Sequence, residues 1–175
     1  DLINCNDLST GDPKFKFSIA KRIMDYAHKY PEELYPDFPL IIPLLDSPNQ
    51  ILKWTAIIAL GRLTKVDLAN HLDKYLPRLY QFLNQREMIT ANNTIMALGQ
   101  FAMVKPNYRQ EILQELLKVE HYQFDTEECG NIAIGKVLFA VSCFFEGLTS
   151  ENKRLALNFA QRATNNSRHT TSTKA

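Results

Sequence analysis

Two stretches of the chain decide its fold class: KWTAIIALGRL, residues 53–63, and NNTIMALGQF, residues 92–101. Each places Ala-Leu-Gly inside an apolar run, and a shift of 38 residues brings Gly61 onto Gly99. A glycine within a helix costs up to ~1 kcal/mol relative to alanine. Its recurrence at one place in two helical patterns therefore predicts close packing between neighbouring helices rather than chance.

The same comparison extends to most of the chain. Shifts of 36 and 43 residues align further apolar positions, and Ser142 then stands where the preceding segment has Gly99. A hairpin of two helices cannot bury both apolar faces alone, so such hairpins stack. The pattern predicts four stacked units, at about 12–48, 49–85, 86–125 and 126–164.

DSPNQILKWTAIIALGRL, residues 46–63, resembles the first helix of a HEAT repeat, a helical hairpin related to armadillo repeats. The matching features are a turn with Asp46 and Pro48, then Lys53, Ala56 and the Ala-Leu-Gly run. The segments FPLIIPLLD and YLPRLYQFLN are similar to the family's proline-containing second helix. The resemblance implies an all-α fold, a right-handed α-α superhelix of about four HEAT-like hairpins, forming one domain over residues 1–164.

Composition is that of an ordinary globular protein. Of 175 residues, 45% are hydrophobic and 22% charged, and the formal net charge is +1. This balance gives no general attraction to nucleic acid or anionic lipid. Three cysteines without ligand spacing favour a reducing compartment, so we expect a cytoplasmic protein. Because Asp1 replaces an initiator Met, we expect a chain that was trimmed or cut from a longer one.

The second helices carry the most informative polar positions. If Leu72, Leu76 and Leu79 face inward, their polar neighbours face outward, and the same argument holds for residues 111–118. The candidate partner-binding residues are Lys74, Arg78, Gln81, Glu111, Glu115 and Lys118. Aligning the two helices places Lys74 beside Glu111 and Arg78 beside Glu115. These residues form either a ladder of surface ion pairs or a surface that meets a partner.

The end of the chain is expected to cover the fourth unit. Residues 132–145 are apolar on nearly every side. They belong to the most hydrophobic stretch, residues 131–148, in which Lys136 and Glu146 argue against a membrane span. Either the amphipathic segment 151–163 covers this helix or another chain does, and we expect the intramolecular cover. Residues 165–175 have no periodicity, which predicts a disordered tail.

A search for catalytic and metal-binding motifs finds no candidate. The chain has no phosphate-binding glycine loop, HExxH, CxxC or Gly-x-Ser-x-Gly pattern. His121, Asp125 and Cys129 could be drawn as a metal cluster, but zinc ligands are usually spaced more tightly. A turn between helices is the simpler interpretation. We therefore expect no catalytic residue, metal or cofactor.

The leading hypothesis is a non-enzymatic scaffold, monomeric and cytoplasmic, that binds a protein or peptide through its second helices. The alternative is suggested by DNA alkylation-repair glycosylases, which also resemble HEAT solenoids and use a basic concave surface with aromatic residues. Trp54 is the only tryptophan, and its apolar neighbours favour packing in the core. Alternating charge signs on the second helices do not build the continuous basic groove that phosphate binding needs.

Overall fold

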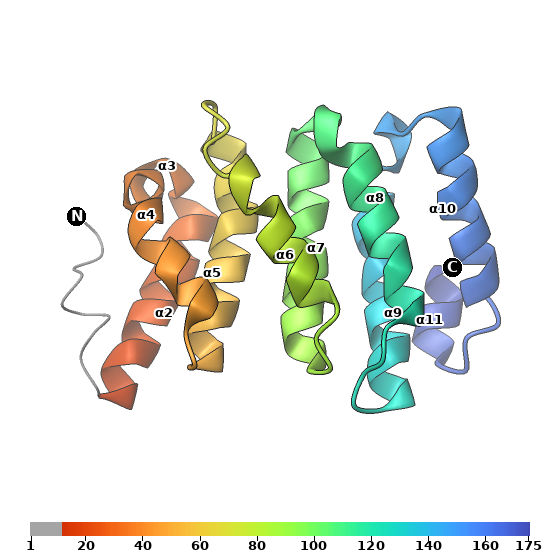
Figure 1. The fold of residues 1–175 in the computed structure, drawn as a ribbon, viewed down its shortest axis with the longest axis horizontal. Helices are drawn as coiled ribbons and strands as arrows, with labels where there is room; N and C mark the ends of the chain where they lie inside the picture. Colours follow the sequence, from red (N-terminus) through yellow and green to blue (C-terminus); the bar gives the residue numbers. More distant parts are fainter. Residues whose placement is uncertain (1–11) are drawn as a thin grey trace. The chain divides into compact units, whose positions relative to one another are not determined.

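The computed structural model describes residues 12–175, apart from the side chain of Pro13, and every regular element in this range is helical (Figure 1). The all-α expectation is confirmed. The chain divides into two compact units, one ending at Lys74 and the other beginning at Tyr75. The expectation of a single domain stays a prediction.

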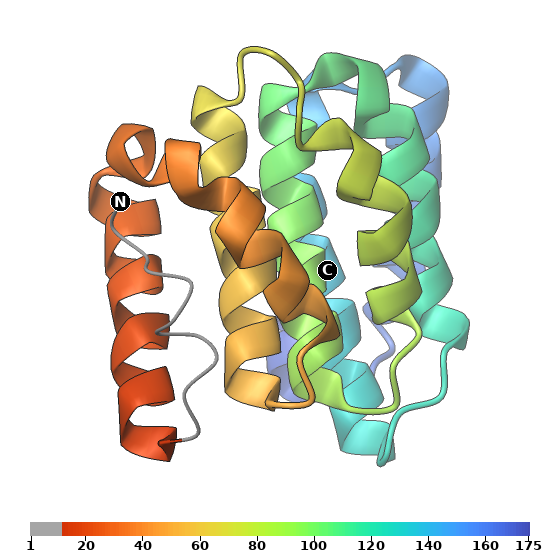
Figure 2. The same ribbon diagram turned by 60° about the vertical axis from the view of Figure 1, so that its left-hand side comes forward.

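In the first unit, the helices α2 (Pro13–Lys29) and α5 (Gln50–Leu63) lie side by side (Figures 1 and 2). Each begins at a capping side chain: Asp12 accepts a hydrogen bond from Lys14 N, and Asn49 accepts from Ile51 N. The two helices are also joined by Arg62, whose guanidinium donates to the carbonyl oxygen of Met24 at 2.9 Å.

Between these helices the backbone is broken into short pieces. They are α3 (Pro31–Leu34), η1 (Tyr35–Asp37), α4 (Phe38–Ile41) and η2 (Ile42–Asp46). Prolines recur at positions 31, 36, 39 and 43, and each removes an amide donor and disfavours helical geometry in the residue before it. A single long second helix therefore cannot form here.

A buried aspartate organises the connection after α5, which includes η3 (Thr64–Val66) and η4 (Asp73–Tyr75). Asp67 is 3% exposed and accepts hydrogen bonds from the amides of His71 and Leu72. The hydroxyl of Tyr35 also donates to it, at 2.5 Å. Burial and this carboxylate raise the pKa of Tyr35 to about 12.

The second unit has two layers of helices. One layer contains α7 (Met88–Val104), α9 (Glu127–Ser142) and α11 (His169–Lys174), in that spatial order. The other contains α6 (Leu76–Leu83), α8 (Arg109–Leu117) and α10 (Ser150–Ala163), joined to the first layer through η5 (Pro106–Tyr108), η6 (Lys118–His121) and η7 (Phe145–Gly147). The apolar residues of α7, α8 and α9 that face between the layers are fully buried.

Contacts between adjacent hairpins recur at nearly constant sequence separation. Arg109 donates to the carbonyl of Gly147 across 38 residues, and Arg168 to Glu128 across 40. Arg162 pairs with Glu120 across 42 residues, at 2.6 Å. Glu128 and Asn131 of α9 contact Arg168 and Thr171 in the same order, so α9 and α11 run parallel, and Figure 1 shows α7 running in the same direction as α9. The separations match the spacing at which Ala-Leu-Gly recurs in the sequence.

The close packing predicted at Gly99 is present. A Cβ built on Gly99 would lie 3.1 Å from the Cβ of Ala140 in α9. This is tighter than side-chain carbons normally approach, so the absence of a side chain lets α7 and α9 meet at this point.

The chain's end forms a helix in place of the predicted disordered tail. In α11, Thr171 is fully buried and its hydroxyl donates to the carbonyl of Asn131 at 2.8 Å. Asn166 and Arg168 bond to Asn131 and Glu128 at the start of α9. A search for apolar periodicity does not detect this helix, because polar side chains make most of its contacts with α9.

The intramolecular cover expected over α9 is incomplete. The helix α10 packs on both α8 and α9, and α11 packs on the first half of α9. Phe144 is buried, but the side chains of Phe139 in α9 and Leu157 in α10 stay 49% and 58% exposed.

Candidate functional site

The candidate residues of α6 lie on its exposed side. Leu76 and Leu79 are buried, as predicted, whereas Arg78 and Gln81 are exposed. Arg78 donates to Gln81 Oε1 at 2.8 Å, and its guanidinium carbon lies 4.9 Å from the centre of the Phe82 ring. Because two contacts hold it on the helix surface, this cation has less conformational freedom than a solvated arginine.

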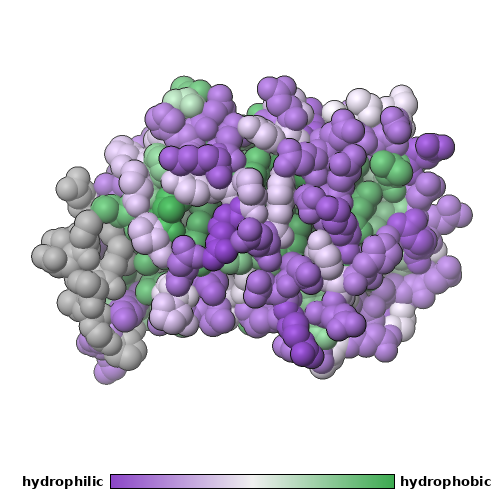
Figure 3. All heavy atoms as spheres, in the orientation of Figure 1, coloured by the Kyte–Doolittle hydropathy of each residue, from purple (hydrophilic) through white to green (hydrophobic). Residues whose placement is uncertain are grey.

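The candidate residues of α8 and η6 are also accessible. Ile112, Leu113 and Leu116 are buried, whereas Glu111 and Lys118 are exposed and Glu115 is half-buried. Lys118 Nζ lies 2.6 Å from Glu115 Oε1. This hydrogen bond raises the pKa of Lys118, so the amine stays charged. We call the exposed side of α6, α8 and the start of η6 the α6–α8 surface; Figure 3 shows mainly hydrophilic side chains there.

The side chain of Tyr80 in α6 lies close to acidic side chains of α8. Burial raises its pKa, and the negative charges of Glu111 and Glu115 raise it further. The hydroxyl is buried and lies near Glu111 without a hydrogen bond of normal geometry. The acidic side chains of α8 thus face the Tyr80 hydroxyl. The cross-helix pairing of Arg78 with Glu115 stays a prediction.

The sixth candidate, Lys74, is exposed in η4 and belongs to the first unit. The other five candidates share the α6–α8 surface. The pairing of Lys74 with Glu111 likewise stays a prediction.

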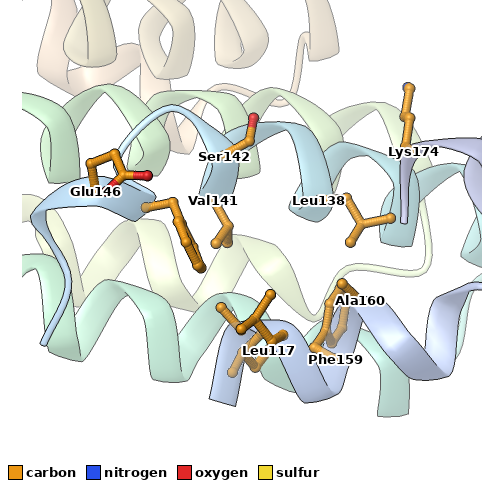
Figure 4. A pocket seen from close by; sticks show the side chains of 11 residues that line it. Leu117, Leu138, Val141, Ser142, Glu146, Phe159, Ala160 and Lys174 are labelled. Atoms are coloured by element: carbon orange, nitrogen blue, oxygen red, sulfur yellow. The ribbon is translucent and has the colours of Figure 1, made fainter. Parts of the chain in front are cut away.

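A second feature was not assigned from the sequence: an apolar groove on the second unit, with a volume of about 260 Å³ (Figure 4). One wall comes from the second half of α9 and η7, and the other from α10. Leu117 of α8 contributes to the floor, and Glu146 and Lys174 lie at opposite ends in the close view. The residues that line it include Leu138, Val141, Ser142, Ala156, Leu157 and Phe159. We call this hollow the α9–α10 groove.

The signal for this groove was present in the sequence. Residues 132–145 are apolar on nearly every side, which indicates that the helix needs cover on all sides. The position of the opening could not be predicted, because it depends on how α9, η7 and α10 pack together.

The residues considered for metal or nucleic-acid binding have other contacts. Arg62 is half-buried and donates to Met24 O, and Trp54 is half-buried. His121 lies beside Glu120, and Asp125 pairs with Arg86. Across residues 12–175, no group of three or more potential ligands is arranged to hold a metal ion.

Two further observations concern the whole described chain. Cys129 and Cys143 are free thiols, and Cys5 falls outside the described residues. None of the helices that the structure describes combines the length and apolar character needed to cross a bilayer.

Two comparisons with known protein sequences found no match. No model of a protein family matches the chain, and no curated protein sequence is detectably similar to it.

Proposed function

We propose that the chain is a HEAT-like α-solenoid that acts as a non-enzymatic cytoplasmic scaffold. Three observations of the second unit support the superhelical architecture. The first-layer helices run parallel, contacts recur at separations of 38 to 42 residues, and Gly99 lies at a helix seam. Stacked hairpins of this kind use extended surfaces for binding.

The partner is a protein or peptide that binds at the α6–α8 surface. The observation that carries this proposal is the fixed, exposed guanidinium of Arg78, which contacts Gln81 and Phe82 on its own helix. An ordered arginine on an accessible surface loses little side-chain entropy on binding, and arginine is frequent among residues that dominate binding energy.

The charge pattern favours a protein over nucleic acid. Glu111 and Glu115 lie on the same surface as Arg78 and Lys118, so cations and anions alternate there. Phosphate backbones need several neighbouring cations. A protein partner can present complementary charges of both signs.

Affinity capture tests the proposal. Wild-type protein, the Arg78→Glu variant and the Arg154→Glu variant are each immobilised, and the proteins that each retains from a cell lysate are compared. Arg154→Glu reverses an exposed charge on α10 and serves as the control. We expect proteins that are retained by the wild type and by Arg154→Glu but lost with Arg78→Glu. Equal retention by all three would exclude the α6–α8 surface. Recovery of nucleic acid alone, released by salt, would support the alternative function.

A further inference from the structure

One continuous segment of the chain builds a further hollow on the second unit, where the connection from α8 enters α9 (Figure 1). Its volume is about 320 Å³, and all of its lining residues fall between Glu120 in η6 and Ile134 in α9. We call it the η6–α9 hollow. This volume lies within the range of ligand-binding pockets, which begins near 300 Å³. Neither end of the described range contributes to its lining.

The connection that forms one wall of the hollow is held at several points. The amide of Tyr122 donates to the carbonyl of Val119 at 3.2 Å. Three residues later, the amide of Asp125 donates to the carbonyl of Arg86, also at 3.2 Å. Thr126 then caps the start of α9. Because the backbone of this wall is already ordered, a bound group meets it at a small cost in conformational entropy.

Two aromatic rings line the hollow. Phe124 packs on Gly130 of α9, since a Cβ built on Gly130 would lie 3.6 Å from the ring. Tyr122 is half-buried; burial raises the pKa of its phenol and the charge of Glu115 raises it further, so the ring stays neutral. The faces of neutral aromatic rings attract cations.

The charged side chains of the lining are both carboxylates. Glu120 is held by Arg162, whose guanidinium nitrogens lie 2.6 and 3.1 Å from its two oxygens. Glu127 is exposed and accepts a hydrogen bond from the Ser167 hydroxyl at 3.3 Å. No cation of the described residues lies within ion-pair distance of Glu127. Charge complementarity therefore favours a cationic ligand.

The location at the start of α9 does not reverse this preference. The positive end of the helix dipole opposes a cation there, but Glu127 and Glu128 in the first turn offset it. The amide of Asn131, which also lines the hollow, is engaged with Asn166 and Ser167. An anionic ligand would thus meet two carboxylates and no available cation.

We propose that the η6–α9 hollow binds the ammonium group of a lysine side chain on a partner protein. The rings of Tyr122 and Phe124 contact the cationic end, and Glu127 pairs with its charge. The apolar stem of a lysine can pack on Ile134. The lining also includes the exposed Thr126, so a side chain can enter while its backbone stays on the surface. This site is separate from the α6–α8 surface, and the inference does not depend on the proposed function.

Matched small probes test the proposal on the full chain. Nα-acetyl-lysine methylamide is compared with its analogue in which a methyl group replaces the ammonium. The Nε-trimethylated probe is compared with its neutral tert-butyl isostere. Binding is followed through the amide signals of residues 120–134 in proton–nitrogen NMR spectra. We expect saturable shifts with a Kd of about 1–10 mM for the cations and binding at least about fivefold weaker for the neutral analogues.

The two cationic probes also distinguish the forms of lysine. Tighter binding of the trimethylated probe would assign the hollow to methylated lysine, and tighter binding of the other probe would assign it to the unmodified side chain. Either order supports the proposal, because both probes carry the alkylammonium group that the rings and Glu127 recognise.

Three variants locate the site. Tyr122→Leu and Phe124→Leu keep apolar bulk but remove an aromatic face, and each should weaken cation binding by about threefold or more. Glu127→Gln should weaken it about twofold to fivefold and leave the neutral probes unaffected. Glu151→Gln removes an exposed carboxylate of α10 outside the hollow and should change nothing. Circular dichroism checks the fold of each variant.

Three outcomes would overturn the proposal. The first is the absence of saturable shifts at probe concentrations up to about 50 mM. The second is equal affinity for charged and neutral probes, which would mean that the hollow is only an apolar depression. The third is equal affinity for the wild type and all three hollow variants, which would place the cation elsewhere. Arg78→Glu should not change these affinities, so failure here leaves the α6–α8 surface unaffected.

Discussion

Gly99 of α7 faces Ala140 of α9 so closely that a methyl group on Gly99 would lie 3.1 Å from the Ala140 side chain. The contact joins the third and fourth predicted units at the second Ala-Leu-Gly motif, residues 97–99. Residue size at this point therefore sets how closely the two helices approach.

The free energy of unfolding should depend steeply on the volume of the side chain placed at position 99. Gly99→Ala gains up to ~1 kcal/mol of helix propensity but crowds Ala140, so we expect little net change. Gly99→Val should lower the free energy of unfolding by about 2–3 kcal/mol. Urea unfolding measures both. Gly130 in α9 is the matched control, because its nearest neighbour would be an ordinary 3.6 Å away, and Gly130→Ala should be stabilising. A Gly99→Val protein as stable as the wild type would contradict the close packing of α7 against α9 at this position.

Thr171→Val should loosen α11. The substitution keeps the shape of the side chain but removes the hydroxyl that donates to Asn131 O, at a cost of about 0.5–1.5 kcal/mol. Hydrogen exchange should show faster exchange in residues 169–174. Thr173→Val is the control, since that exposed hydroxyl bonds only within α11, to His169 O. If the two variants exchanged alike, the buried bond would not be what holds this helix.

Tyr35 should titrate late and affect stability only at high pH. Its pKa of about 12 lies above the unfolded value of 10, so its contribution is fully present below pH 10 and is lost as the pH rises through 12. Tyrosine absorbance near 295 nm reports the titration. Tyr35→Phe should remove this late step, and Asp67→Asn should lower the pKa of Tyr35. A titration curve unchanged by Tyr35→Phe would refute the assignment.

Arg62→Lys should destabilise the first unit although it keeps the charge. Lysine cannot place a planar donor on the carbonyl of Met24 in the same way, and we expect a loss of about 1 kcal/mol. Thermal unfolding measures the loss. Arg154→Lys on α10, an exposed position, provides a comparison that we expect to change stability less. Equal effects would mean that the Arg62 bond adds nothing specific.

Periodicity predicted the parts of the fold that depend on apolar burial. Ile112 and Leu116 of α8 are buried as expected, and Glu111 is exposed, because a helix presents residues three and four apart on one face. The recurrence of Ala-Leu-Gly likewise predicted that a neighbouring helix packs closely at Gly99, although not that Ala140 makes this contact. These features are local or repeat at a fixed spacing, so one sequence is sufficient to find them.

Features that depend on polar contacts or on chain ends were missed. The helix α11 is held by Thr171 and Arg168, which apolar patterns do not register. The α9–α10 groove depends on how α9, η7 and α10 pack together, and no sequence motif encodes that arrangement. The partner of Arg78 was also not foreseen, because a side chain can bond along its own helix as well as across to the next.

The near-constant spacing of contacts in the second unit has a consequence for how the chain acquires its structure. Arg109 and Gly147, or Glu128 and Arg168, meet across about 40 residues, so no contact of this kind requires the distant ends of the chain to find each other. Low contact order of this sort is associated with fast folding. We expect each hairpin to dock on its predecessor soon after it leaves the ribosome, with α11 docking last.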